Sequence, residues 1–112
     1  MTAHAESHNL DTIFEALGNH HRREIIYALS LQPHSISQLA KMCELSLPAI
    51  HKHIKILKDA ELVLDKKNGR THFLTINRFA LLKLQDWLMQ YQPYWGNNKE
   101  TLENYEEFLK KK

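Results

Sequence analysis

Apolar residues recur every three or four positions along most of this chain, which is the spacing of amphipathic helices. The first half is predicted to form four helices, over residues 10–17, 20–30, 35–42 and 47–60. Gly18 and Pro33 separate the first three, because glycine ends helices and proline breaks them. Asn19, Ser35 and Ser46 precede the later helices and are suited to cap them, since their side chains accept hydrogen bonds from the first free backbone N–H groups.

After residue 60 the pattern changes to one typical of strands. Residues 62–64 and 72–76 are rich in branched and aromatic side chains, and Asn68 and Gly69 between them are a strong hairpin signal. A helical stripe returns in the C-terminal third, where Pro93 is expected to kink or split the helix.

Two short helices joined by a turn of three or four residues form a helix-turn-helix, and a hairpin directly after the second helix is a wing. The sequence therefore predicts an all-α domain with a small β-hairpin wing, a winged helix-turn-helix, with extra helices at both ends. We expect a flexible leader over 1–9, the winged helix-turn-helix domain over 10–92, and a helical extension over 93–112 that takes part in dimerisation.

Length and composition limit the function classes. With 112 residues, of which 43% are hydrophobic, the chain is expected to form one globular domain. Its three glycines form no phosphate-binding loop or nucleophile elbow, so we expect neither an enzyme nor a bound cofactor. The single Cys43, the lack of an apolar run of about 20 residues and the lack of a secretory signal favour the cytoplasm without membrane contact.

The net charge of +2 is small, but the charges are unevenly distributed. Residues 46–83 carry eight basic and three acidic side chains, whereas the segments before and after them are slightly acidic. Local positive charge of this kind is typical of a surface that binds a polyanion. The alternative is a lysine-rich face exposed only to solvent, and charge alone does not decide between the two.

The helix predicted over 47–60 has two different faces. Ile50, Ile54 and Leu57 follow the i, i+4, i+7 spacing and are expected to pack inward. The opposite face is polar and cationic, as suits a helix that enters the major groove of DNA. The residues expected to contact DNA from this helix and its cap are Ser46, Leu47, Pro48, His51, Lys52 and Lys55.

Within this set, His51 and Lys52 are candidates to reach guanine, and Leu47 to touch a thymine methyl group. The face lacks Arg, Asn and Gln, which make two-pronged base contacts, so it is expected to read sequence weakly. The alternative for His51 is an exposed side chain without a base contact. His53, at the edge of the apolar face, is expected to be packed and hydrogen-bonded.

The predicted wing over 65–71 is also cationic. Lys66, Lys67 and Arg70 flank its turn and are expected to lie along the DNA backbone or in the minor groove. Two further cations, Arg22 and Arg23, occupy the first turn of the second helix, where they oppose its dipole. A structural salt bridge is the expected explanation for them, and a phosphate contact is the alternative.

The segment around the predicted recognition helix resembles the signature of the ArsR/SmtB-type winged-helix repressors, at Ser46, Pro48, Ala49, His53, Lys55, Leu57, Ala60, Leu62 and Val63. An upstream segment is similar to that family at Phe14, Leu17, Asn19, Arg22, Arg23 and Ile25, and the wing is similar at Gly69 and Arg70. The resemblance covers about residues 10–95. It implies a homodimeric, DNA-binding bacterial or archaeal transcriptional regulator that leaves its operator on receiving a signal.

The chain departs from that family pattern at several positions. His20 replaces a proline, and Glu61 replaces a glycine. The second replacement is expected to strain the turn into the first strand, because glycine would cap the preceding helix. Where thiolate sensors of the family have C-V-C, this chain has residues 35–37, Ser-Ile-Ser. The positions matching the family's zinc ligands on the last helix are Arg78, Ala80, Tyr91 and Tyr94, none of which binds zinc.

No other residues are expected to bind a metal. Cys43 is isolated in the sequence and is expected to be a small buried hydrophobic residue. His20 and His21 are adjacent, and His51 and His53 lie on different faces of their helix, so neither pair is suited to hold one ion.

The C-terminal third carries more large apolar side chains than a small domain can bury, which indicates a partner surface. A second copy of the chain is the expected partner, through Leu10, Ile13, Phe14, Leu81, Leu84, Leu88, Tyr91 and Trp95. A two-fold dimer implies a pseudo-palindromic site.

The main hypothesis is a sequence-specific double-stranded DNA-binding transcriptional regulator, acting as a repressor. The rival hypothesis is a winged-helix protein-interaction module that uses the aromatic tail and does not bind DNA. The resemblance leaves open whether the C-terminal aromatic side chains line a pocket for a small-molecule effector.

Overall fold

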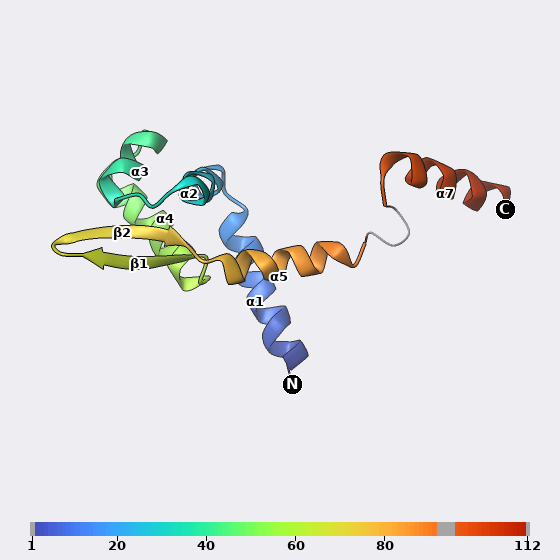
Figure 1. Cartoon of the computed structure of the whole chain (residues 1–112), viewed down its shortest axis with the longest axis horizontal. Helices are drawn as coiled ribbons and strands as arrows, with labels where there is room; N and C mark the ends of the chain where they lie inside the picture. Colours follow the sequence, from blue (N-terminus) through green and yellow to red (C-terminus); the bar gives the residue numbers. More distant parts are fainter. Residues whose placement is uncertain (1, 92–95, 112) are drawn as a thin grey trace. The chain divides into compact units, whose positions relative to one another are not determined.

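The computed structural model describes the backbone of residues 2–91 and 96–111, and the side chains from residue 9 onward within those ranges. Its elements (Figure 1) are α1 (Thr2–Leu17), α2 (His20–Leu31), α3 (Ile36–Cys43), α4 (Leu47–Asp59), β1 (Val63–Asn68), β2 (Thr71–Ile76), α5 (Arg78–Met89) and α7 (Asn98–Lys110). This confirms the predicted fold class. None of the described helices is long and apolar enough to span a bilayer. The chain divides into two units, residues 1–81 and 82–112.

Capping side chains set the starts of α2, α3 and α4, as the sequence predicted. The Asn19 side chain accepts a hydrogen bond from the Arg22 backbone N–H at 3.2 Å, and the Ser46 hydroxyl accepts one at 3.3 Å from the N–H three residues on. Ser35 and Gln38 form a reciprocal capping box, with side-chain to backbone distances of 3.2 and 2.9 Å. Each cap satisfies backbone donors that a helix leaves free at its start.

Helix α1 is longer than predicted. It begins at Thr2 rather than at Leu10, so most of the segment 1–9, expected to be a flexible leader, is helical. That segment holds strong helix formers such as Ala3, Ala5 and Glu6, and neither glycine nor proline. The prediction relied on apolar periodicity, which begins only at Leu10.

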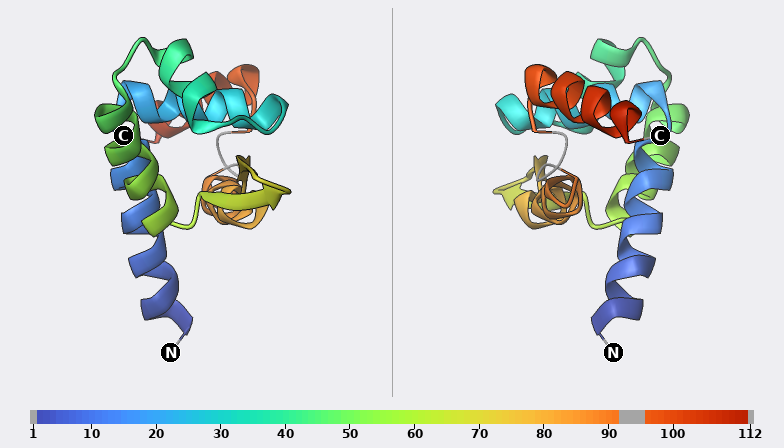
Figure 2. Two further views of the ribbon diagram at one scale, coloured as in Figure 1. Left: turned by 90° about the vertical axis from the view of Figure 1, so that its left-hand side faces the viewer. Right: turned by 90° about the vertical axis from the view of Figure 1, so that its right-hand side faces the viewer.

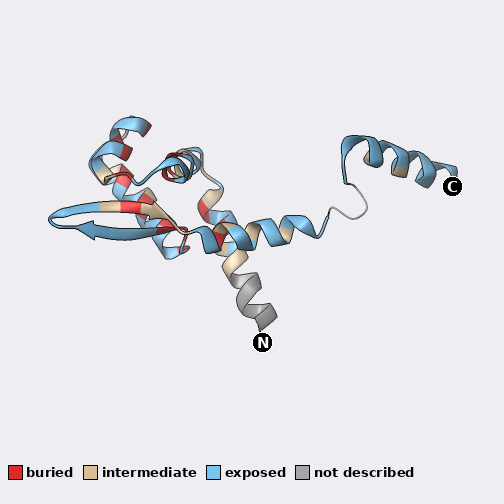
Figure 3. Ribbon diagram, viewed as in Figure 1, coloured by how far each residue is buried: buried red, intermediate tan, exposed pale blue. Residues whose placement is uncertain are grey.

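The core of the first unit lies where α1, α2, α3, α4 and the hairpin meet, as the red segments of Figure 3 show. Helices α1 and α4 lie side by side in both views of Figure 2 and contact each other. The largest fully buried side chains come from all of these elements and from the connection after α4: Ile13, Ile25, Leu39, Ile50, Leu57, Leu62 and Leu74. Burial of so many large groups around α4 fixes which of its faces points to solvent.

The wing is a two-stranded antiparallel hairpin. Asn68 lies opposite Thr71, so the turn consists of Gly69 and Arg70, one residue later than the Asn-Gly pair suggested. Gly69 has φ +66°, at the first central position where type II′ hairpin turns take glycine. The turn therefore places Arg70 at the tip of the wing.

One residue before α3 helps to tie the wing to the helices. His34 exchanges two backbone hydrogen bonds with Leu74 of β2, at 3.2 and 2.8 Å, and is itself buried. Its ring Nδ1 lies 2.9 Å from the Gln32 carbonyl oxygen. The connection between α2 and α3 thus acts as a one-residue third strand.

The second unit contains most of α5, and α7. The predicted interruption of the C-terminal helix is confirmed, because α5 ends at Met89 and α7 begins at Asn98. Asn97 and Glu100 form a capping box for α7, with backbone to side-chain distances of 2.9 and 3.3 Å. Pro93 and the predicted boundary between residues 92 and 93 lie outside the described residues.

The turn from α4 into β1 is a Schellman motif with a strained residue. The Leu62 N–H donates to the Leu57 carbonyl, and the Glu61 N–H donates to the Lys58 carbonyl, both at 2.9 Å. Between them, Glu61 has φ +59°, in the left-handed region that favours glycine. The Asn77 side chain donates to the Glu61 carbonyl at 2.7 Å and helps to hold this conformation.

Replacing Glu61 with glycine should stabilise the chain. The substitution keeps every backbone hydrogen bond and removes the Cβ that disfavours this conformation, so we expect a gain of about 0.5–1 kcal/mol in the free energy of unfolding. Urea denaturation followed by circular dichroism measures the change. The matched variant Glu61→Ala removes the charge but keeps the Cβ, and should show no such gain. Equal effects of both variants would contradict backbone strain as the cause.

Candidate nucleic-acid interface

Helix α4 presents a sharply divided surface. Ile50, Ile54 and Leu57 are 0–2% exposed and face the core, as predicted. Pro48 is the second residue of the helix, where a missing N–H costs nothing. With one face buried in this way, α4 has a single rotational setting.

The residues predicted to contact DNA from α4 all lie on its exposed side: Ser46, Leu47, Pro48, His51, Lys52 and Lys55. The Ser46 hydroxyl is engaged as the cap, and Leu47 is 51% exposed at the start of the helix. Lys55 forms an ion pair with Asp59 at 3.2 Å, which offsets part of its charge. Lys52, one turn earlier, is therefore the stronger candidate for a phosphate contact.

The wing carries its cations in the open. Lys66, Lys67 and Arg70 are all exposed, at or next to the tip of the hairpin. Because successive strand residues point to opposite faces, Lys66 and Lys67 present charge on both sides of the ribbon. Lys58, at the end of α4, forms an ion pair with Asp65 of β1, which links the wing to the helix.

Arg22 and Arg23 have a role that the sequence did not indicate. The Arg22 side chain donates to the Ala16 and Glu15 carbonyl oxygens at 2.5 and 3.4 Å, and Arg23 donates to the Leu17 carbonyl at 2.8 Å. These carbonyls end α1, whose negative dipole end favours cations. The two arginines therefore cap the end of α1 instead of forming the expected salt bridge. Their positions in the first turn of α2 gave no indication of this role.

His53 joins this cap to α4. Its Nδ1 lies 3.2 Å from an Arg22 guanidinium nitrogen, and its ring is half-buried, which confirms the prediction of a packed, hydrogen-bonded histidine. Burial, and then the positive charges of Arg22 and His21, lower the pKa of His53 below its ordinary value of 6.5. The neutral ring thus links α1, α2 and the recognition helix.

The residues predicted for the dimer interface are found in different environments. Ile13 is 2% exposed in the core of its own subunit, so its assignment to the interface is wrong. The helical stripe alone could not distinguish a core position from an interface position. Leu10, Leu81 and Leu84 are half-buried; Phe14, Leu88 and Tyr91 are 43–57% exposed; Trp95 lies outside the described residues.

The structure also brings together three side chains that the sequence did not connect. His21, Glu24 and Cys43 place their ligand atoms within 4.8 Å of one another, although Cys43 is 19 or more residues away in the chain. Burial, and then the negative charge of Glu24, raise the pKa of the Cys43 thiol. Only the packing of α3 against α2 creates this cluster, so Cys43 is not isolated in space.

A winged helix-turn-helix with an exposed cationic recognition helix defines a class of DNA-binding regulators. The family model of bacterial regulatory proteins of the arsR family matches residues 19–64. The arsenical resistance operon repressor of Staphylococcus aureus is 33% identical over 72 residues, which cover 64% of this chain and 69% of that protein. The chain belongs to the arsR family, a class of transcriptional regulators and not of enzymes, as the sequence predicted.

Two further comparisons agree with this. A transcriptional regulator of Methanocaldococcus jannaschii is 49% identical over 49 residues, which make up 44% of this chain. The match spans only 52% of that relative's length. A solved structure, an ArsR-like transcriptional regulator from Rhodococcus sp. RHA1, is 27% identical and matches with a TM-score of 0.74 over 100% of this chain and 99% of that one.

The stability of the chain should depend on pH through His53. Because the folded state lowers the pKa of this ring, the unfolded chain binds the proton more readily. The free energy of unfolding should therefore be highest above the ordinary value of 6.5 and fall as the pH drops through the lower, folded pKa. Urea denaturation at a series of pH values measures this, and His53→Gln should flatten the dependence. An unchanged pH dependence in that variant would contradict the assignment.

Proposed function

We propose that the chain binds double-stranded DNA as a homodimer and represses transcription from a pseudo-palindromic operator in the cytoplasm. The observation that carries the proposal is the division of α4, with a buried apolar face and an exposed face bearing His51, Lys52 and Lys55. A helix held in this way can enter the major groove, which is wide enough for one α-helix. The cationic wing next to it would lie along the backbone or in the minor groove.

Two groups of residues would have different tasks. Phosphate attraction falls to the cations on α4 and the wing: Lys52, Lys55, Lys66, Lys67 and Arg70. Sequence preference falls to the exposed start of α4, where Leu47, Pro48, His51 and Lys52 would meet base edges. Ser46, whose hydroxyl caps α4, would contact DNA next to them.

Dimerisation would use exposed apolar side chains of the helices that flank the wing domain. On α5 and just after it, Leu88 and Tyr91 are 57% and 55% exposed, and α7 has no buried residue although it carries Leu102, Tyr105, Phe108 and Leu109. Exposed apolar groups in this number favour a protein partner. A second copy is the simplest one, because a two-fold pair also presents two recognition helices to one face of DNA.

The effector of this regulator is a separate matter. The Staphylococcus aureus relative is named for arsenical resistance, but this chain has Ser35 and Ser37 where the resemblance implies the cysteines of thiolate sensors. We propose that its signal acts elsewhere on the chain. No observation favours the rival hypothesis of a protein-interaction module without DNA binding.

Replacing Lys52 should weaken DNA binding without changing sequence preference. Loss of one phosphate contact lowers affinity about equally on all duplexes and reduces the slope of log affinity against log salt by about one unit. Fluorescence anisotropy at several salt concentrations measures both, on sites selected from random DNA. The control Lys110→Ala, at the end of α7, should keep the slope of the unmodified chain. A Lys52→Ala variant with that unmodified slope would contradict the assigned contact.

Replacing His51 should have the opposite effect. We expect His51→Ala to change the ratio of affinities for the selected site and a mismatched site by about 1 kcal/mol, roughly fivefold, with a smaller effect on nonspecific binding. Competition anisotropy with the two duplexes provides the ratio. A uniform loss on both duplexes would show that His51 does not read bases.

A charge in the apolar stripe should separate the subunits. Leu88→Glu buries an unpaired carboxylate in the proposed interface, so the chain should sediment as a monomer at micromolar concentration. Gln85→Glu introduces the same charge at an exposed polar position of α5 and should leave the dimer intact. Sedimentation velocity distinguishes the two, and a dimeric Leu88→Glu variant would exclude this interface.

A further inference from the structure

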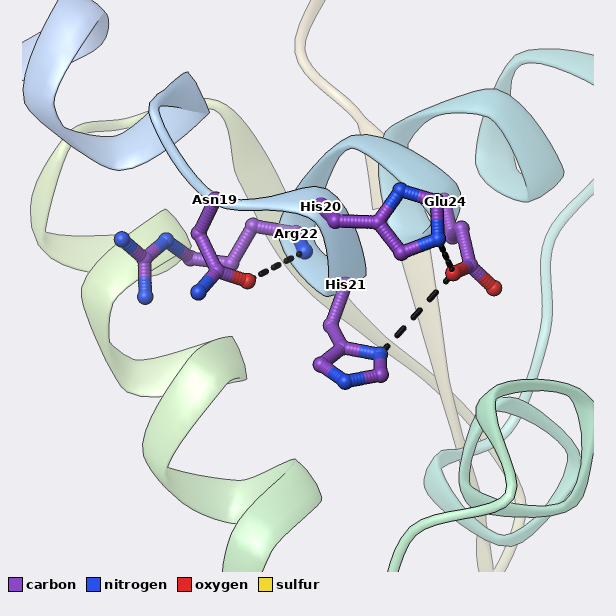
Figure 4. A network of polar contacts seen from close by, with 5 residues as sticks. All are labelled: Asn19, His20, His21, Arg22 and Glu24. Atoms are coloured by element: carbon purple, nitrogen blue, oxygen red, sulfur yellow. Dashed lines mark hydrogen bonds and ion pairs between the residues drawn. The ribbon is translucent and has the colours of Figure 1, made fainter.

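Three side chains with metal-binding chemistry converge where α2 meets α3. His21 lies in the first turn of α2, Glu24 follows three residues later on the same helix face, and Cys43 is the last residue of α3. Their imidazole nitrogen, carboxylate oxygen and thiol sulfur lie within 4.8 Å of one another. Figure 4 shows His20 and His21 both directed towards the Glu24 carboxylate.

One polar atom of this cluster is buried without making a hydrogen bond. His21 Nδ1 is buried and has no hydrogen-bond partner, and the nearest carboxylate oxygen, Glu24 Oε1, is 3.9 Å away. Buried polar atoms without a partner are rare, and each calls for an explanation such as a bound ion. An ion pair with Glu24, 2.6 Å away, accounts for the position of the His20 side chain. It does not account for the missing hydrogen-bond partner of His21 Nδ1.

We propose that His21 Nδ1, Glu24 and the Cys43 sulfur bind a divalent cation of the Zn²⁺ class. One nitrogen, one oxygen and one sulfur ligand match the borderline softness of zinc, whereas calcium and magnesium prefer oxygen ligands alone. Ligand atoms around tetrahedral zinc lie about 3.5 Å apart. Side-chain rotations that move the ligand atoms by about 1 Å would bring the three to that spacing. The thiol proton is released to solvent when the sulfur binds the cation.

The surroundings complete the site. Glu24 and Cys43 line a pocket of about 340 Å³ between α2 and α3, which provides an entry path and room for a water as fourth ligand. His20 contacts the Glu24 carboxylate at 2.6 Å and would orient it, as outer partners of metal-bound carboxylates do. The site therefore has three protein ligands, one open position and a supporting side chain.

This cation site would be connected to the recognition helix. The His21 ring lies 5.6 Å, centre to centre, from the ring of His53 on α4, which is also in contact with Arg22. A cation held at His21 Nδ1 fixes the orientation of that ring beside α4. The cation would thus be held between α2 and α3, by a histidine whose ring lies beside that of His53 on α4.

Cobalt titration of the untagged chain tests the site. Cys43 is the only cysteine, so a sulfur-to-cobalt charge-transfer band can arise only from this residue. We expect one Co²⁺ per chain, visible bands typical of tetrahedral cobalt, and displacement by one equivalent of Zn²⁺ with a dissociation constant below about 1 µM. His21→Gln and Glu24→Gln should each weaken binding about tenfold or more.

The control His72→Gln removes an exposed histidine of β2 and should bind Co²⁺ like the unmodified chain. Histidine ring NMR supplies a readout independent of affinity: Zn²⁺ should shift the His21 and His53 ring resonances and leave His72 unchanged. Absence of the charge-transfer band, or binding that is unaffected by His21→Gln and Glu24→Gln, would overturn the proposal. Either result would leave the proposed DNA-binding function standing, because that function is tested separately by the DNA affinities of the Lys52 and His51 variants.

Discussion

The burial of Ile50, Ile54 and Leu57 is the constraint on which the rest of the structure depends. Each apolar side chain moved out of water contributes about 1.5–3 kcal/mol, so any rotation of α4 that exposed them would be strongly unfavourable. The same burial turns His51 and Lys52 to solvent. A surface that can meet DNA is thus a direct consequence of how the core is packed.

Features that depend on local sequence were predictable. The caps at Asn19, Ser35 and Ser46, the buried face of α4 and the strain at Glu61 follow from side-chain chemistry and spacing within a few residues. The exposed cations followed from the same helical geometry. His53 was also placed correctly, because its position at the edge of the apolar face required a polar partner.

Features that depend on tertiary contacts were not predictable. Arg22 caps α1 only because α1 ends beside the start of α2. Ile13 is core rather than interface because α1 packs against α2 and α4. Cys43 joins His21 across two helices, a relation that spacing along the chain does not contain. In each case the packing of helices brought together residues whose local patterns gave no sign of it.

Lysine footprinting in the presence of a selected duplex measures the central claim most directly. Reductive methylation with and without DNA compares the reactivity of every lysine amine in one experiment. If α4 and the wing form the DNA-binding face, DNA should protect Lys52, Lys55, Lys66 and Lys67 and leave Lys41 and Lys99 reactive. Protection of Lys41 or Lys99 with α4 and the wing still reactive would contradict the account.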